Sequence, residues 1–152
     1  LRGLRQRKAL RRTAVGLTAG FLALSAVGIA LNHPYECAYY NVLIPRDATE
    51  TMEMDTWNVC PTGAYRQLLS QTEGHVTIGC YFNDLIPAAY KLPADLRARL
   101  TVTHEDDEPY LYYGATYAWV YHAVPPAGYR ELFSIKSYGN TVGTVYERVE
   151  EP

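Results

Sequence analysis

The sequence predicts an α/β protein in which one N-terminal transmembrane helix is followed by a small extracytoplasmic α/β domain. Residues 13–31 form a run of 19 residues without a charge, which predicts the transmembrane helix. Beyond the run, stretches with helical spacing and stretches with strand alternation follow one another, separated by glycine and proline. This order predicts a mixed sheet of about five strands that is covered by helices and ends in a C-terminal β-hairpin.

Charge divides the chain at the apolar run. Six of the 14 basic residues lie among residues 1–12, and the first acidic residue is Glu36. The formal net charge of -2 therefore combines a basic start with an acidic remainder. We expect no nucleic acid partner, because an acidic domain repels a phosphate backbone.

The apolar run is long enough to cross a cell membrane. At a rise of about 1.5 Å per residue it covers roughly 28 Å, close to the hydrocarbon thickness of a bilayer. Basic flanks stay in the cytoplasm, so we expect residues 1–12 inside, residues 13–31 across the membrane and the rest outside. Gly16 and Gly20 allow close approach of another helix of the parent protein. The alternative is a cleaved signal peptide, which has similar basic and apolar regions.

Residues 32–60 are predicted to form a junction at the membrane surface. Pro34 disfavours helix at the residue before it, so the transmembrane helix should end near Leu31 or Asn32. Three tyrosines follow within six residues: Tyr35, Tyr39 and Tyr40. Such rings suit the headgroup region, where the ring is buried and the hydroxyl meets water. Neither effect explains His33 or Asn41.

Residues 61–149 are predicted to form the α/β domain. An amphipathic helix over residues 62–72 begins after Pro61, and a strand over residues 75–82 follows it. Alternate residues of this strand form its buried side: Val76, Ile78 and Cys80.

Two prolines divide residues 84–100 into two short helical pieces. The next strand covers residues 100–103, and the chain between the two strands is long enough for a crossover. We therefore expect these strands to be parallel and their connection right-handed. Residues 110–121 supply a further strand that is rich in tyrosine.

The chain is predicted to close with a hairpin. Residues 129–138 and 141–149 alternate in hydrophobicity and flank Gly139-Asn140, a two-residue turn signal. In the first of these strands one face is predicted to be buried and the other to be exposed to solvent. One face carries Phe133 and Ile135, and the opposite face carries Leu132, Ser134 and Lys136.

The three cysteines predict at most one disulfide. In an oxidising compartment the favoured pair is Cys37 with Cys60, because Cys80 falls on the buried side of a strand. Neither Cys-x-x-Cys nor His-x3-His is present, so we expect no metal site, and no cofactor is expected. The acidic loop at residues 105–108 lacks the spacing of a calcium loop, so we expect a solvated turn there.

Three short motifs follow the apolar run: His33-Pro34-Tyr35, Tyr39-Tyr40-Asn41 and Asp55-Thr56-Trp57. Together they resemble the C-terminal segment of polytopic bacterial membrane glycosyltransferases of the GT-C type, which are similar to dolichyl-phosphate-mannose protein mannosyltransferases. In that group the last transmembrane helix runs into a His-Pro-Tyr stretch, and an Asp-Tyr-Trp element follows. Residues 133–148 resemble the terminal hairpin of the group. Residues 44–47 depart from it, because they replace its usual glycines.

The resemblance implies a polyprenyl-phosphate-linked sugar donor and transfer of the sugar outside the cytoplasm. The catalytic Asp or Glu of that group lies in its first extracytoplasmic loop, so the resemblance implies no catalytic residue in this chain. The segment by itself would be non-catalytic. Its implied partners are the lipid bilayer, the sugar donor and the remaining transmembrane helices of the parent protein.

Six residues form the candidate donor-binding set: His33, Tyr35, Tyr40, Asn41, Asp55 and Trp57. At the membrane face they offer hydrogen-bond donors and stacking surfaces to a lipid-linked phosphate sugar. The alternative is structural. In that case Asp55 caps the following helix or bonds the His33 ring, and Trp57 fills the gap between domain and membrane.

A second functional hypothesis is a complete single-span protein whose anchored α/β domain binds a partner or serves as a subunit of an envelope complex. Because the chain begins with Leu1 rather than Met, we expect residues before it. Further apolar spans among those residues would favour the enzyme, and an initiating Met within a few residues would favour the single-span protein.

Overall fold

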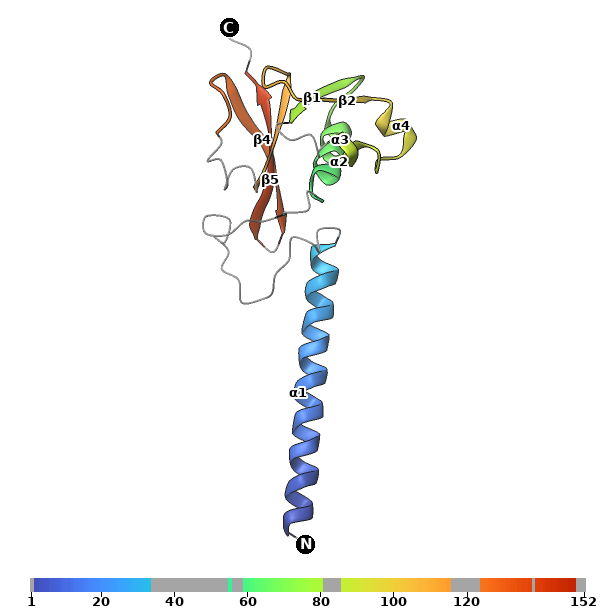
Figure 1. Ribbon diagram of the computed structural model, residues 1–152, viewed down its shortest axis with the longest axis vertical. Coiled ribbons are helices and arrows are strands. Elements are labelled where there is room, and N and C mark those ends of the chain that lie inside the picture. The colour runs from blue at the N-terminus through green and yellow to red at the C-terminus, as the bar shows by residue number, and fades with distance from the viewer. Residues whose placement is uncertain are drawn as a thin grey trace.

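A computed structural model of the protein describes residues 2–33, 55, 59–80, 86–115, 124–137 and 139–149. Figure 1 shows a long N-terminal helix and a domain in which one sheet carries helices on one face. The predicted fold class is therefore confirmed: a long apolar helix precedes a small α/β domain with a mixed five-stranded sheet.

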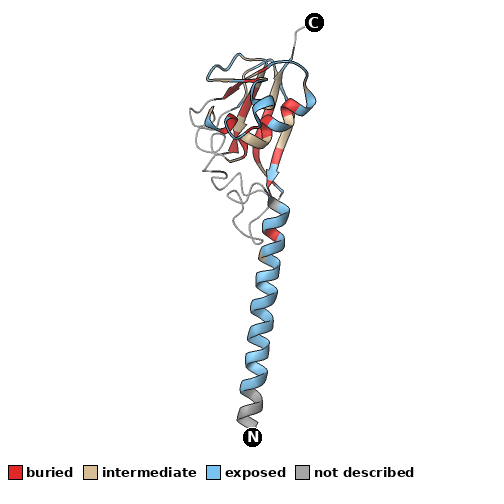
Figure 2. Ribbon diagram, turned by 90° about the vertical axis from the view of Figure 1, so that its right-hand side faces the viewer, coloured by how far each residue is buried: buried red, intermediate tan, exposed pale blue. Residues whose placement is uncertain are grey.

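Helix α1 (Arg2–Asn32) is a single helix of 31 residues. It includes the basic segment as well as the apolar run, because Arg, Lys, Leu and Ala are all good helix formers. The stretch Arg7–Leu31 is long and apolar enough to cross a membrane or to act as a signal sequence. Nearly the whole of this helix is exposed (Figure 2), and the apolar side chain of Phe21, for example, belongs to a residue that is 69% exposed.

The domain begins with α2 (Pro61–Gln71) and β1 (Val76–Cys80). The remaining elements follow in the order α3 (Ile86–Ala89), α4 (Ala94–Arg97), β2 (Leu100–Thr103), β3 (Tyr110–Gly114), β4 (Tyr129–Ser137) and β5 (Asn140–Arg148). The helix after Pro61, the two short helical pieces and the strands after them lie where the sequence predicts. Of the predicted strand over residues 110–121, β3 covers Tyr110–Gly114, and residues 116–121 lie outside the described residues.

The five strands lie in the order β2-β1-β3-β5-β4. Strand β1 pairs in parallel with both β2 and β3, which confirms the predicted parallel pair. Strand β5 pairs antiparallel with β3 on one side and with β4 on the other. The C-terminal hairpin thus extends a parallel sheet into a mixed one.

The core lies between α2 and the sheet. Helix α2 buries one face against β3 and β5, and its side chains there are Ala64, Tyr65, Leu68 and Leu69. The ring of Tyr65 meets that of Tyr112 edge to face, with 6.2 Å between the centroids. Val76, Ile78 and Cys80 are buried, as the alternation of β1 predicts. Figure 2 shows that the buried residues of the domain lie on both its helices and its strands.

The C-terminal hairpin forms as predicted, but its turn lies one residue earlier. Ser137 pairs with Asn140, so Asn140 belongs to β5 rather than to the turn. Gly139 has φ 85°, a left-handed conformation that glycine adopts without strain.

The alternation predicted for β4 is only partly correct. Ile135 is buried and Lys136 exposed, but Leu132 and Phe133 are both half-buried against the core. A register shift between Glu131 and Phe133 is the reason, because a bulge changes which face each residue presents.

The connection from β2 to β3 crosses β1, because β1 lies between these two strands. It passes directly over Gly79, where a Cβ atom would collide with the carbonyl oxygen of Glu105. The same Cβ would lie 2.8 Å from the Cδ2 atom of Leu111. Glycine at this position therefore allows the acidic loop to cross the strand.

Arg99 closes the C-terminal end of α2. Its guanidinium donates to the carbonyl oxygens of Leu69 at 3.3 Å, Thr72 at 2.6 Å and Gly74 at 2.9 Å. The last carbonyls of a helix have no partner within the helix, and a cation also suits the negative end of the helix dipole. One side chain before β2 thus fixes the end of a helix 28 residues earlier.

We expect Arg99→Met to lower the free energy of unfolding by about 2–3 kcal/mol, because three charge-assisted hydrogen bonds are lost. Arg99→Lys should recover less than half of this, since an ammonium lacks the planar fork of donors. Urea denaturation of the full chain in detergent micelles, followed by near-UV circular dichroism, measures the loss. Arg66→Met, at an exposed position of α2, is the matched control. An equal effect at both positions would contradict the capping role.

Candidate functional site

Two of the six candidate donor-binding residues lie in the part of the chain that the structure describes. His33 follows the last turn of α1 and is exposed. Asp55 stands just before α2 and is 2% exposed. The other four, Tyr35, Tyr40, Asn41 and Trp57, lie outside the described residues, as does Cys37. Contact of this set with a sugar donor therefore stays a prediction.

Asp55 organises the entry of the chain into the domain. Its Oδ1 atom accepts the backbone N–H of Val59 at 2.9 Å, and its Oδ2 atom accepts that of Cys60 at 3.0 Å. Helix α2 begins at the next residue, Pro61. Asp55 itself has φ 57°, in the left-handed region, which Asp and Asn tolerate better than most residues. Both carboxylate oxygens are thus used within the turn that precedes the helix.

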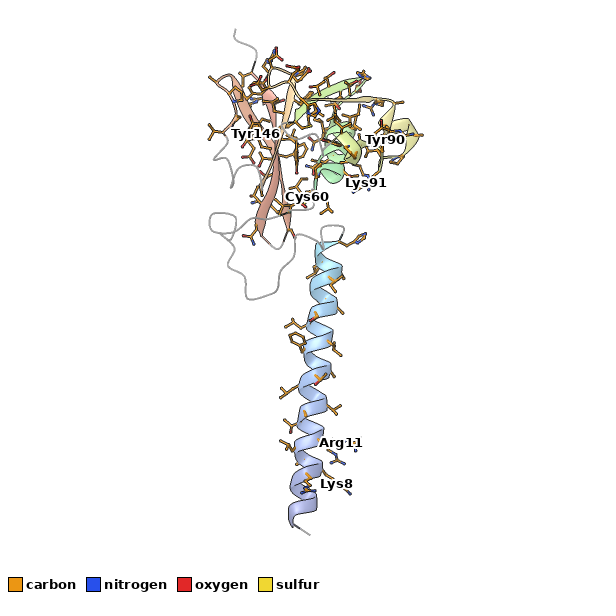
Figure 3. All side chains as sticks on the ribbon, in the orientation of Figure 1. Lys8, Arg11, Cys60, Tyr90, Lys91 and Tyr146 are labelled. Carbon is orange, nitrogen blue, oxygen red and sulfur yellow. The ribbon has the colours of Figure 1, made fainter. Side chains whose placement is uncertain are left out.

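Burial raises the pKa of Asp55 above its usual value of 3.8. The hydrogen bonds from Val59 and Cys60 act in the opposite direction, and so does the charge of Lys91. Lys91 follows α3, so a residue from a different part of the chain lies near enough to influence the carboxylate. Figure 3 shows Lys91 and Cys60 at the same end of the domain, facing α1.

We expect Asp55→Ala to lower the free energy of unfolding by about 2–4 kcal/mol, because two amides lose their acceptor and alanine is strained at positive φ. Asp55→Gly should be about 1 kcal/mol less damaging, since only the strain is relieved. Urea denaturation of the full chain in micelles compares the two variants. If the two variants lost the same free energy of unfolding, the left-handed backbone conformation of residue 55 would contribute nothing to the damage in Asp55→Ala.

Asp55 should also give a pH dependence of known sign. With a raised pKa, the folded chain binds more protons than the unfolded chain between pH 3.8 and the folded-state pKa. The free energy of unfolding should therefore fall as the pH rises through this interval. Asp55→Asn removes the titration. The difference in free energy of unfolding between the wild type and Asp55→Asn should decrease as the pH rises from 3.8 to the folded-state pKa, and it should stay constant at higher pH.

The described cysteines are both buried. Cys80 donates through Sγ to the carbonyl oxygen of Thr103 at 3.3 Å. Burial raises the pKa of the Cys80 thiol to about 11, so it is protonated and unreactive near neutral pH. The predicted disulfide between Cys37 and Cys60 stays a prediction, because Cys37 lies outside the described residues.

A groove of about 360 Å³ lies at the other end of the domain, where the acidic loop meets the turn before β4. The residues that line it include Asp106, Asp107, Gly128, Tyr129 and Arg148. The Tyr129 hydroxyl donates to the carbonyl of Glu108 at 2.6 Å and accepts from Nη2 of Arg148 at 2.9 Å.

The hydrogen bonds of the Tyr129 hydroxyl occupy polar atoms of this groove that would otherwise be open to a ligand. The guanidinium of Arg148 also lies 5.5 Å from the centre of the Tyr129 ring, so ring and cation hold each other in place. Across residues 103–108, Thr103 donates to Glu108 at 2.9 Å, which ties the acidic loop to the end of β2. Within the described ranges no group of three His, Cys, Asp or Glu residues is placed to hold a metal ion.

The sequence did not single out Tyr129 or Arg99, and it identified Arg148 only as the end of the hairpin at residues 133–148. Their partners are backbone carbonyls and residues far away along the chain, and no local motif marks such contacts. Comparison with known protein families, with curated proteins and with solved structures finds no match to this chain.

Proposed function

We propose that this chain is the last transmembrane helix and outer domain of a membrane glycosyltransferase that uses a polyprenyl-phosphate-linked sugar. Helix α1 crosses the bilayer, residues 1–12 face the cytoplasm and the α/β domain lies outside. The catalytic carboxylate belongs to a part of the enzyme beyond this chain. The segment anchors the outer domain and supplies part of the wall of the donor site.

One observation carries this proposal. The two described residues of the motifs stand at the two ends of the junction: His33 closes the apolar helix, and Asp55 opens the domain by bonding the turn before α2. A motif that joins a membrane helix to a domain needs one residue at the end of the helix and another at the start of the domain. The geometry of Asp55 supports a positioning role, because its carboxylate is buried and occupied by two backbone amides.

A second candidate is a single-span protein whose anchored domain binds a partner. The groove beside Tyr129 and Arg148 favours it, because it lies at the C-terminal end of β5, which points away from α1 (Figure 1), and combines acidic, basic and aromatic side chains. Of the residues that line this groove, only Arg148 lies within the segments that resemble the glycosyltransferases.

Sugar transfer by the protein that the complete reading frame encodes distinguishes the two candidate functions. Membranes containing it are incubated with a panel of tritiated polyprenyl-phosphate sugars, and label released from the lipid is counted. We expect release from one donor. His33→Ala should reduce it about tenfold or more without lowering thermal stability, whereas Asp55→Asn should lower stability as well. Matched membranes without the protein are the control, and the absence of release from every donor would overturn the enzyme assignment.

A further inference from the structure

An exposed tyrosine and two cations lie together on the helical side of the domain. Tyr90 follows α3 and is 69% exposed. The guanidinium carbon of Arg97, in α4, lies 5.7 Å from the centre of its ring, and Nη1 of Arg97 donates to the Tyr90 carbonyl at 3.4 Å. Lys91 is exposed beside it. We call Tyr90, Lys91 and Arg97 the Tyr90 surface.

The turn that carries this surface is held by its backbone. The amide of Tyr90 donates to the carbonyl of Pro87 at 3.1 Å, and that of Lys91 donates to Ala88 at 3.2 Å. Among the described residues no carboxylate forms an ion pair with Lys91 or Arg97, although the charge of Lys91 also acts on the buried carboxylate of Asp55. The two charges are therefore presented to the surroundings by a fixed segment.

Charge is unevenly distributed over the domain. Residues 86–99 contain three cations and one acid, Asp95, whereas the loop at residues 104–108 contains four acids and no Lys or Arg. Lys91 lies at the end of the domain that faces α1 (Figure 3), and the C-terminus lies at the opposite end (Figure 1). The basic and aromatic surface is thus nearer to α1 than the acidic loop is.

The segment between His33 and Asp55 tethers the domain, and with it the Tyr90 surface, to the membrane. Asp55 lies 22 residues after His33, and a chain of that length can span at most about 75 Å, so the domain cannot leave the vicinity of a bilayer that α1 crosses. A tethered contact forms at a high effective concentration, and weak attraction is then sufficient. Each Lys or Arg near an anionic lipid surface favours contact by about fivefold, and a tyrosine ring suits the headgroup layer.

We propose that the Tyr90 surface contacts anionic phospholipid headgroups of the same bilayer that α1 crosses. This inference rests on the membrane-spanning role of α1 in the proposed function, and it is independent of any sugar transfer. The contact would hold the domain in one orientation, with the acidic loop and its groove directed away from the membrane.

An environment-sensitive nitrobenzoxadiazole probe on Ala94→Cys tests this inference, because Ala94 is exposed and lies between Lys91 and Arg97. The full chain carries Cys37→Ser, while Cys60 and Cys80 are buried. It is reconstituted into nanodiscs of phosphatidylcholine with or without phosphatidylglycerol. The matched probe on Ala127→Cys reports the exposed opposite end, and a probe on Val15→Cys reports insertion of α1.

We expect the emission of the Ala94→Cys probe to shift to the blue only with phosphatidylglycerol and to revert at high salt. The Ala127→Cys probe should not respond. Lys91→Gln with Arg97→Gln should lower the contact equilibrium constant on the order of 25-fold, with unchanged near-UV circular dichroism. Equal emission in both bilayers while the Val15→Cys probe reports insertion would overturn the lipid contact and leave the anchoring intact. A water-exposed Val15→Cys probe would overturn both.

Discussion

Gly79→Ala is expected to lower the free energy of unfolding of the domain by about 3 kcal/mol or more. The new Cβ would meet the carbonyl oxygen of Glu105 and also the side chain of Leu111. Overpacking of a core usually costs about 1–3 kcal/mol, and here the obstacle is backbone that cannot change rotamer. Urea denaturation of the full chain in micelles measures the loss.

The control for this variant is Gly114→Ala, in the neighbouring strand β3. A Cβ there would lie 3.5 Å from the nearest atom of the Tyr112 ring, which is ordinary van der Waals contact. We expect its effect to stay within about 1 kcal/mol. If Gly79→Ala were as mild as Gly114→Ala, the acidic loop would not cross β1 at this point.

Gly143→Ala is expected to cost about 2–3 kcal/mol for a different reason. Gly143 lies in β5 opposite Gly114, and the ring of Tyr112 rests against it. An added Cβ would lie 2.8 Å from Cε2 and Cζ of that ring and in closer contact with its hydroxyl oxygen. Tyr112 is buried in the core against Tyr65, so its ring cannot swing away.

A double-mutant cycle with Tyr112→Leu isolates this collision. Leucine lacks the distal ring atoms, so Gly143→Ala should cost at least 1 kcal/mol less in that background than in the wild type. Thermal and urea denaturation of the four proteins give the coupling. Simple additivity of the two substitutions would mean that the ring does not restrict this position.

Most of the fold follows from local patterns in the sequence. Pro61 and the spacing of Tyr65, Leu68 and Leu69 predict α2, and the alternation of Val76, Ile78 and Cys80 predicts β1. The two prolines of residues 84–100 predict the break between α3 and α4. Each of these features depends on residues within one turn or one strand, where propensity and burial act together.

The features that the sequence did not predict depend on residues far apart. The capping of α2 by Arg99 and the crossing of β1 over Gly79 both require the sheet order, which periodicity does not contain. The hairpin turn lies one residue earlier than predicted, because Ser137 pairs with Asn140, and this cross-strand register is not contained in the local turn signal. At the junction, the pattern identified Asp55 but could not show which amides its carboxylate accepts.

The side of the membrane on which the domain lies is the most direct test of the account. A membrane-impermeant maleimide is applied to intact cells and to inverted membrane vesicles containing the full chain. One cysteine is introduced at an exposed position, as Ala127→Cys or as Lys8→Cys, in the Cys37→Ser background, where Cys60 and Cys80 are buried. The account predicts labelling of Ala127→Cys in cells only and of Lys8→Cys in inverted vesicles only. The reverse pattern, or labelling of both positions from one side, would contradict a spanning α1 with an outer α/β domain.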